Sequence, residues 1–149
     1  MKKKIIITGG LGYIGTELCK LYSGLSWYHQ IIVIDNRFIS ERVNQVRNWN
    51  MKFIQGDILD KNLIQKYCKD ADVVHHLAGI TDVPRTKSEA SKTHDEKIKE
   101  VGEKGTQNIL DVISNKCKII FPSTHVVYEG IDKVKTDINE DEKTIPVLS

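Results

Sequence analysis

The chain has 149 residues, of which 40% are apolar and 28% charged, and its net charge is +2. A single soluble globular domain with one sizeable core is expected at this length and composition. The nearly balanced charge gives no sign of nucleic-acid binding, and no apolar run approaches the roughly 18 residues that a membrane span needs. We therefore expect neither a nucleic-acid partner nor a membrane partner.

Three cysteines, at positions 19, 68 and 117, are widely spaced and form no Cys-x-x-Cys motif. An odd number at such spacing fits reduced thiols better than a disulfide framework or a zinc site. We expect a cytoplasmic protein without a bound metal, in which the cysteines fill apolar space.

Short apolar runs rich in isoleucine and valine alternate along the chain with segments of helical spacing. In chain order, the sequence predicts a strand at Lys3–Thr8, a helix at Tyr13–Tyr22, strands at Gln30–Asp35 and Lys52–Gln55, a helix at Lys61–Cys68, a strand at Asp72–Leu77, a helix near Glu96–Ser114 and a strand at Lys118–Phe121. The polar stretch before Lys52 is assigned no element. About the last 25 residues, which have weak periodicity, are interpreted as loop.

Strands that alternate with helices indicate parallel pairing through right-handed crossovers. Near-continuous apolar strands are typical of a sheet covered on both faces. The sequence thus predicts an α/β fold, a Rossmann-type doubly wound parallel sheet with strand order 3-2-1-4-5 and helices on both faces. No internal linker is evident, so residues 1–149 are expected to form one domain.

Gly10-x-Gly12-x-x-Gly15 follows the first predicted strand and opens the first predicted helix. The first glycine allows a sharp turn, the second lets a pyrophosphate approach the backbone, and the third lets the helix pack closely on the strand. The helix N-terminus then presents free N–H groups and a positive dipole end to the phosphates. Asp35 ends the second strand about twenty residues later, which is the context that this motif needs. The loop therefore predicts a bound dinucleotide.

Asp35 bears on the choice between the two nicotinamide dinucleotides. Its carboxylate can accept hydrogen bonds from both hydroxyls of the adenosine ribose, and it would repel a 2′-phosphate. We therefore expect NAD as the cofactor. NADP is the less favoured alternative, which Arg37 keeps open.

A nested spacing, Thr8-Gly9-x-x-Gly12-x-x-Gly15, resembles the extended short-chain dehydrogenase/reductase family, that is, the NAD-dependent nucleotide-sugar epimerases and dehydratases. Further stretches resemble family motifs in the right order: Asp35-Asn36, Gly56-Asp57-Ile58, His76-Leu77-Ala78-Gly79, Gly105-Thr106-x-Asn108-Ile109-Leu110 and Phe121-Pro-Ser-Thr-His-Val-Val-Tyr128. The resemblance covers essentially the whole chain. It implies NAD as cofactor and a nucleotide sugar as substrate.

The resemblance also implies site residues. Cofactor contacts fall on Gly9, Gly12, Tyr13, Ile14, Gly15, Asp35, Asn36, Asp57, Ile58, Leu77, Ala78, Gly79 and Ser123. Of these residues, Asp57 is implied to face the adenine. Outside this list, Thr124 matches the catalytic Ser/Thr that shares a hydrogen bond with the substrate. The family also uses a Tyr-x-x-x-Lys pair, in which the lysine lowers the pKa of the tyrosine so that the tyrosine can remove a proton from a sugar hydroxyl.

Two departures from the family pattern limit the expected activity. Tyr-x-x-x-Lys does not occur in these 149 residues, and Gly102 stands where the family usually has Asn. Counting from Thr124 places the family's tyrosine near Ser149. We therefore interpret the chain as the NAD-binding N-terminal part of such an enzyme, not catalytic by itself. Two alternatives stay open: a free-standing NAD-binding sensor or regulator, and a split enzyme whose tyrosine and lysine come from another polypeptide.

Two further expectations concern the strands. His75 and His76 are adjacent in a strand, so they face opposite sides of the sheet and cannot readily share a metal ion. We interpret them as a structural pair. The fifth strand is expected to leave an uncovered edge, and such an edge invites pairing with another chain. We therefore expect self-association, such as a homo-oligomer, or a loosely ordered C-terminal segment.

Overall fold

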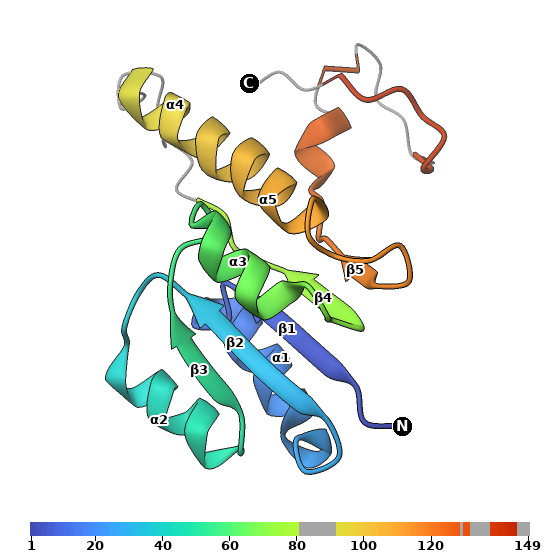
Figure 1. Ribbon diagram of the computed structural model, residues 1–149. Helices are drawn as coiled ribbons and strands as arrows, with labels where there is room; N and C mark the ends of the chain where they lie inside the picture. Colours follow the sequence, from blue (N-terminus) through green and yellow to red (C-terminus); the bar gives the residue numbers. More distant parts are fainter. Residues whose placement is uncertain (81–91, 129, 132–137, 146–149) are drawn as a thin grey trace.

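A computed structural model describes residues 1–80, 92–128, 130–131 and 138–145. At its centre is a five-stranded parallel sheet in the order β3-β2-β1-β4-β5, which confirms the predicted topology. The strands are β1 (Lys4–Thr8), β2 (Gln30–Asp35), β3 (Lys52–Gln55), β4 (Val73–His76) and β5 (Lys118–Ile120). Figure 1 shows helices packed around the sheet and the chain after β5 leading away from it.

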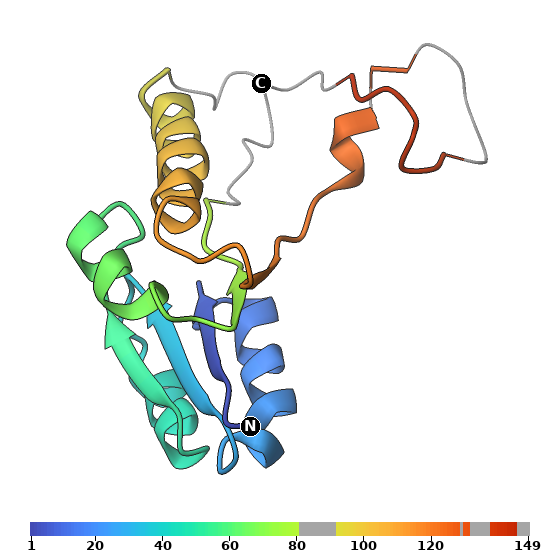
Figure 2. The same cartoon turned by 45° about the vertical axis from the view of Figure 1, so that its right-hand side comes forward.

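Helices lie in the connections between consecutive strands. They are α1 (Tyr13–Tyr22), α2 (Ser40–Asn48), α3 (Lys61–Cys68) and a long helix made of α4 (Lys92–Glu100), a π-helical segment (Val101–Gly105) and α5 (Thr106–Leu110). Two short 3₁₀ turns, Ser23–Leu25 and His125–Tyr128, are also present. In the turned view of Figure 2, α1 and α3 lie on opposite sides of the sheet, so the sheet is doubly wound. No helix in the described part of the chain has the length and apolar character that a membrane crossing requires.

Two apolar cores fill the two faces of the sheet. Successive strand side chains point to opposite faces, so Ile5 and Ile7 enter one core and Ile6 enters the other. The first core, toward α1 and α2, contains Ile5, Ile7, Leu11, Cys19, Ile31, Val33, Val43, Val46 and Met51. The second, toward α3 and α5, contains Ile6, Ile32, Ile34, Ile58, Ile64, Cys68, Ala71, Val74 and Ile109. Burial on both faces explains the nearly continuous apolar strands.

The prediction was wrong at α2, where the sequence was assigned no element. Val43 and Val46 are the two apolar residues of this helix, and both are fully buried. Two apolar positions three residues apart give too little periodicity to reveal a helix among seven polar neighbours. Tertiary packing of this valine pair, not the local pattern, therefore accounts for α2.

Several predicted boundaries also moved. The long helix begins at Lys92 instead of Glu96 and ends at Leu110 instead of Ser114, and each of three strands is one or two residues shorter than predicted. β5 ends at Ile120 because Pro122, just beyond, has no N–H with which to extend the ladder. The predicted C-terminal loop begins with a 3₁₀ turn at His125–Tyr128, and residues 130–131 and 138–145 form no helix or strand. Residue 129 and the segments 132–137 and 146–149 of this loop lie outside the described residues.

The strand register brings the carboxyl ends of the strands to one edge of the sheet. Thr8, the last residue of β1, pairs with Ile34 of β2 on one side and with His76 of β4 on the other. Asp35 pairs with Gln55 of β3. The direction of winding reverses between β1 and β4, and open α/β sheets bind ligands at such a switch point.

The fifth strand lies at the edge of the sheet, and β4 is its one strand neighbour within the described residues. Ile120 is 36% exposed and the following Phe121 is 59% exposed. No further strand of the described ranges pairs with this edge, which agrees with the uncovered edge expected from the sequence. Self-association through it stays a prediction.

Candidate functional site

The loop between β1 and α1 makes its sharp turn at Gly9, whose φ of +67° belongs to the left-handed region. The turn was predicted for the first glycine of Gly10-x-Gly12-x-x-Gly15, but it falls one residue earlier. Gly9 N donates to Ile34 O at 2.8 Å, and Gly12 N donates to Gly9 O at 3.0 Å. At Gly15 a Cβ would lie 2.5 Å from Gly9 O, so α1 packs directly on the turn.

The first turn of α1 has no side-chain cap. Its N-cap residue is Gly12, which supplies no capping hydrogen bond, and Thr16 Oγ1 donates to Gly12 O at 2.8 Å. Helices whose first N–H groups lack a cap satisfy them with water or an anion, which the positive end of the helix dipole also favours. Tyr13 and Ile14, which begin the helix, are 84% and 63% exposed and so stand at the rim of this loop.

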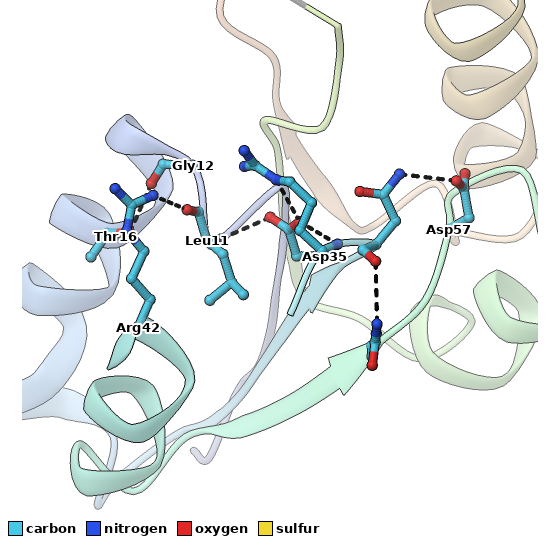
Figure 3. Close-up of polar contacts among 9 residues, drawn as sticks. Leu11, Gly12, Thr16, Asp35, Arg42 and Asp57 are labelled. Atoms are coloured by element: carbon cyan, nitrogen blue, oxygen red, sulfur yellow. Dashed lines mark hydrogen bonds and ion pairs between the residues drawn. The ribbon is translucent and has the colours of Figure 1, made fainter. Parts of the chain in front are cut away.

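Asp35 lies at the carboxyl end of β2, beside the glycine loop (Figure 3). Its Oδ2 accepts from Leu11 N at 2.9 Å. Its Oδ1 accepts from Arg37 N at 3.0 Å and from Arg37 Nε at 3.4 Å. The carboxylate is 3% exposed while the Arg37 side chain is 58% exposed. Asp35 therefore lies beside the glycine loop, and Arg37 contacts its carboxylate.

Arg42 is a contributor to the loop that the sequence analysis missed. Its Nη1 donates to Leu11 O, the carbonyl of the residue whose N–H bonds Asp35. Figure 3 shows Arg42 reaching from α2 to the loop. Because α2 itself was not predicted, the sequence offered no reason to place Arg42 there. Val43 and Val46 alone give too little periodicity to supply one, so no pattern in the sequence points to this contact.

Asp57 joins the site from the loop after β3. Its Oδ2 accepts from Asn36 Nδ2 at 3.1 Å, and its Oδ1 accepts from Leu59 N at 2.9 Å. Gln55 Nε2 donates to Asn36 O at 3.4 Å, so the ends of β2 and β3 are joined by side chains. Asn36 and Asp57, which the resemblance implies as cofactor contacts, are thus neighbours in the fold.

Ile58 points away from this edge into the core. Its side chain is 4% exposed, and its δ-carbon lies 2.3 Å from where a Cβ of Gly105 would stand. Asn108 Nδ2, which is buried on α5, donates to Ile58 O at 3.0 Å. A cofactor contact expected at Ile58 would therefore use its main chain. Asn108 holds this carbonyl in place, a function that its motif alone did not suggest.

The segment after β4 closes the other side of the glycine loop. Leu77 N donates to Thr8 O at 3.1 Å, and a Cβ on Gly9 would lie 2.7 Å from Ala78 N. Leu77 and Ala78 are half-buried, and Gly79 is exposed. Leu77 and Ala78 therefore lie directly against the turn.

The two histidines of β4 face opposite sides of the sheet, as predicted. His75 Nε2 bonds Tyr22 OH on α1 at 2.9 Å, while His76 Nε2 bonds Thr106 Oγ1 on α5 at 3.0 Å. Burial lowers the pKa of both rings, and Lys118 lowers the pKa of His75 further. In the described part of the chain, no cluster of acids, histidines and cysteines could hold a metal ion.

Ser123 and Thr124 lie in the exposed segment between β5 and the 3₁₀ turn. They are the residues that the resemblance implies for the reacting end of the site. The described structure thus brings together the residues implied for the adenosine and phosphate end. It leaves these two at the surface beyond β5.

The cysteines behave as apolar filler, as expected. Cys19 and Cys68 are fully buried, and Cys117 is half-buried. Burial raises the pKa of Cys19 to about 12 and that of Cys68 to about 11. A thiol that stays protonated is a poor nucleophile and a poor metal ligand.

The strand order, the tight glycine turn and the acid at the end of β2 define a Rossmann-type α/β domain. The model of the 3-beta hydroxysteroid dehydrogenase/isomerase family matches residues 6–146. The chain therefore belongs to this family.

Its relatives are nucleotide-sugar enzymes, as the resemblance implies. The chain is 34% identical over 130 residues to UDP-N-acetyl-alpha-D-glucosaminuronate decarboxylase of Bacillus cytotoxicus, covering 86% of this chain and 38% of that protein. It is 34% identical over 153 residues to CDP-paratose 2-epimerase of Salmonella typhi, covering 95% of this chain and 42% of that protein. The chain thus spans less than half the length of these curated relatives.

Solved structures agree in fold. UDP-N-acetylglucosamine 4-epimerase from Methanobrevibacter ruminantium M1, in complex with UDP-N-acetylmuramic acid, matches with a TM-score of 0.77 at 26% identity, covering 99% of this chain and 46% of that one. A variant of UDP-glucuronic acid 4-epimerase from Bacillus cereus, in complex with UDP-4-deoxy-4-fluoro-glucuronic acid and NAD, matches with a TM-score of 0.76 at 27% identity, covering 99% of this chain and 47% of that one.

Proposed function

We propose that this chain is the NAD-binding part of an enzyme that acts on nucleotide sugars. The observation that carries the proposal is the glycine turn at the switch point. Gly9 turns the chain, Gly15 brings α1 onto that turn, and Asp35 stands beside it. Pyrophosphate binding requires such a close approach to backbone N–H groups at a helix N-terminus.

The pyrophosphate of NAD would lie over the loop from Gly10 to Gly15. The first turn of α1 has no side-chain cap that would compete with the ligand. The Arg37 Nη2 atom lies 3.9 Å from the Cβ position of Gly12, so a cation stands near the place proposed for the phosphates. The dipole of α1 and this cation both favour an anion there.

The adenosine ribose would bind at Asp35. Asp35 Oδ2 accepts one hydrogen bond and keeps a further lone pair for a ribose hydroxyl, whereas Oδ1 accepts from both Arg37 N and Arg37 Nε and regains a lone pair when the guanidinium moves. The Arg37 side chain covers this carboxylate and would have to swing aside. The Arg37 side chain is 58% exposed, and the carboxylate keeps its bonds from Leu11 N and Arg37 N when the guanidinium moves. The adenine would then lie toward Asn36 and Asp57.

The reaction would take place beyond β4 and β5, toward Thr124. NAD, when bound, supplies the hydride acceptor for oxidation of a sugar hydroxyl. The Tyr-x-x-x-Lys pair that the resemblance implies as base is not in these 149 residues. We therefore propose that this chain alone binds NAD without turning over a nucleotide sugar.

Isothermal titration calorimetry with NAD tests the binding claim, and a coupled assay with UDP-glucose tests the catalytic one. We expect a Kd in the micromolar range, which corresponds to about −8 kcal/mol at 1 μM, and no turnover. Absence of binding at millimolar NAD would overturn the proposal. Turnover by this chain alone would overturn its non-catalytic part while leaving NAD binding intact.

A further inference from the structure

We infer that His76 is a positioning residue, which holds the Leu77–Ala78 peptide against the glycine turn through one directed chain of hydrogen bonds. The chain of bonds crosses the switch point between β1 and β4 and ends in the π-helical segment. The inference rests on the proposed function in one respect, namely that the positioned peptide is a wall of the NAD site.

The bonds form an unbroken series. Ala78 N donates to Thr8 Oγ1 at 3.3 Å, and Thr8 Oγ1 lies 2.7 Å from His76 Nδ1. On the far side of the ring, His76 Nε2 lies 3.0 Å from Thr106 Oγ1, which donates to Gly102 O at 2.5 Å. Thr8 and His76 are 0% and 1% exposed, so water does not compete for these groups.

The two ends of the series fix its direction. A backbone N–H can only donate and a carbonyl can only accept. Since the hydroxyl proton of Thr106 goes to Gly102 O, Thr106 Oγ1 must accept from the ring, and the imidazole carries its proton on Nε2. Nδ1 then has a lone pair, which accepts the hydroxyl proton of Thr8. The hydroxyl oxygen of Thr8 is left to accept from Ala78 N.

This assignment leaves no member of the series unsatisfied. No buried side-chain nitrogen or oxygen among the described residues lacks a partner. The direction requires a neutral ring, and burial, which lowers the pKa of His76, favours that form. A protonated ring would donate from both nitrogens, and the hydroxyl of Thr8 would then lose its acceptor.

The near end of the series holds two consecutive N–H groups. Thr8 binds Leu77 N through its carbonyl oxygen and Ala78 N through its hydroxyl. The peptide thus fixed lies where a Cβ on Gly9 would be, 2.7 Å from Leu77 C and from Ala78 N. No space remains between this peptide and the turn, so a shift of the one displaces the other.

The far end of the series lies where the long helix departs from α-helical geometry. Thr106 follows the π-helical segment Val101–Gly105 directly, and Gly102 belongs to that segment. Single π-turns inside α-helices are frequent at functional sites. Because Gly105 packs on Ile58, the series also ties His76 to the helix that borders the adenine side of the site.

A set of variants separates positioning from simple stabilisation. Thr106→Val removes the hydroxyl at nearly constant volume, and Thr106→Ser restores it. Tyr22→Phe is the matched control, because it breaks the hydrogen bond of the neighbouring His75 on the opposite face of β4. We expect Thr106→Val to weaken NAD binding about ten-fold, the scale on which a buried group that loses its partner acts. Thr106→Ser and Tyr22→Phe should stay close to the parent chain.

Nitrogen NMR of the His76 ring and amide exchange at Ala78 give a readout that needs no cofactor. We expect the ring proton on Nε2 alone, and faster exchange of the Ala78 amide in Thr106→Val than in Tyr22→Phe. A proton on Nδ1, or equal exchange in the two variants, would overturn the inference. If NAD fails to bind the parent chain, the proposed function falls while these measurements still decide the positioning claim. If NAD binds and Thr106→Val binds it as tightly as the parent chain does, the positioning claim is wrong.

Discussion

The carboxylates at the glycine-loop edge and the side chains just beyond β5 differ in how far they are exposed to solvent. At the loop edge, Asp35 and Asp57 each accept hydrogen bonds on both carboxylate oxygens. Beyond β5, Phe121, Ser123 and Thr124 are exposed at the surface. The chain therefore orders the residues proposed for the adenosine and phosphates of NAD in advance, and presents those proposed for the reaction on an open surface.

Gly15→Ala should break the ordered region most strongly. The new Cβ would lie 2.5 Å from Gly9 O and 2.6 Å from Gly10 Cα, so the turn or α1 must move. Overpacking of this kind costs about 1–3 kcal/mol, and we expect NAD affinity to fall by about 100-fold at the upper end of that range. Isothermal titration calorimetry on the folded variant measures this loss of NAD affinity.

Gly24→Ala is the matched control for that variant, since no atom lies within 4 Å of its Cβ position. We expect it to bind NAD as the parent chain does. Equal losses in the two variants would show that the close contact at Gly15 has no special role.

Asp35→Asn should have the next largest effect. The amide oxygen can keep the bond from Leu11 N, but the charge that strengthens hydrogen bonds to the ribose is lost. Hydrogen bonds to charged groups contribute about 1.5–3 kcal/mol, so we expect NAD affinity to fall at least about ten-fold. Asp70→Asn, at an exposed position after α3, is the control. A Kd for Asp35→Asn equal to that of the control would remove Asp35 from the site.

Arg37→Ala should sharpen the choice between cofactors. Without the guanidinium over Asp35, NAD no longer displaces a side chain, and a 2′-phosphate meets an uncompensated carboxylate. The freed carboxylate favours NAD while the loss of the cation near the proposed phosphates disfavours it, so NAD affinity should change by less than about five-fold, or roughly 1 kcal/mol, whereas NADP affinity should fall. The Kd values for NAD and NADP, measured by competition, give the ratio of the two affinities in each chain. Tighter NADP binding in Arg37→Ala would contradict this interpretation.

The region beyond β5 can be tested through self-association of the chain. The uncovered edge at β5 and the exposed Phe121 invite a second strand, so light scattering should report a mass above that of one chain. Phe121→Lys should lower that mass, whereas Trp27→Lys, which changes an aromatic that is 75% exposed away from β5, should not. A monomeric mass for the parent chain would rule out association through this edge.

Acidification should have the smallest effect. Burial lowers the pKa of His75 and His76 in the folded chain, while in the unfolded chain both titrate near about 6.5. Below that pH the unfolded state binds protons that the folded state does not, so the free energy of unfolding should fall as pH drops below about 6.5. Urea unfolding at about pH 7.5 and pH 5.5 measures this, and His76→Gln should reduce the dependence. Constant or rising stability on acidification would contradict it.

The strands and the helix α2 differ in how far the sequence predicts them. Isoleucine-rich strands that are buried on both faces have a pattern that needs no tertiary information, so strand order and the ends of β2 and β3 were predicted correctly. The helix α2 depends on two valines that pack on the sheet, and the contact of Arg42 with Leu11 depends in turn on α2. Spacing along one chain cannot reveal such contacts.

The hydrogen bonds between side chains could also not be predicted from the sequence. The resemblance brought Asn36 and Asp57 to one ligand, but the direct bond between them is a product of the fold. The arginine that covers Asp35 and the hydrogen-bond series through His76 depend on rotamers and on strand register. Residue types alone specify neither.

The most direct test of the central claim is an NMR titration of the isotope-labelled chain with NAD, followed through its backbone amides. We expect saturable shifts at Gly10–Gly15 and at Asp35–Arg37, with smaller shifts at Asp57 and Ala78 and none along the outer face of α3. Shifts confined to other surfaces, or none at millimolar NAD, would contradict a dinucleotide site at the glycine turn.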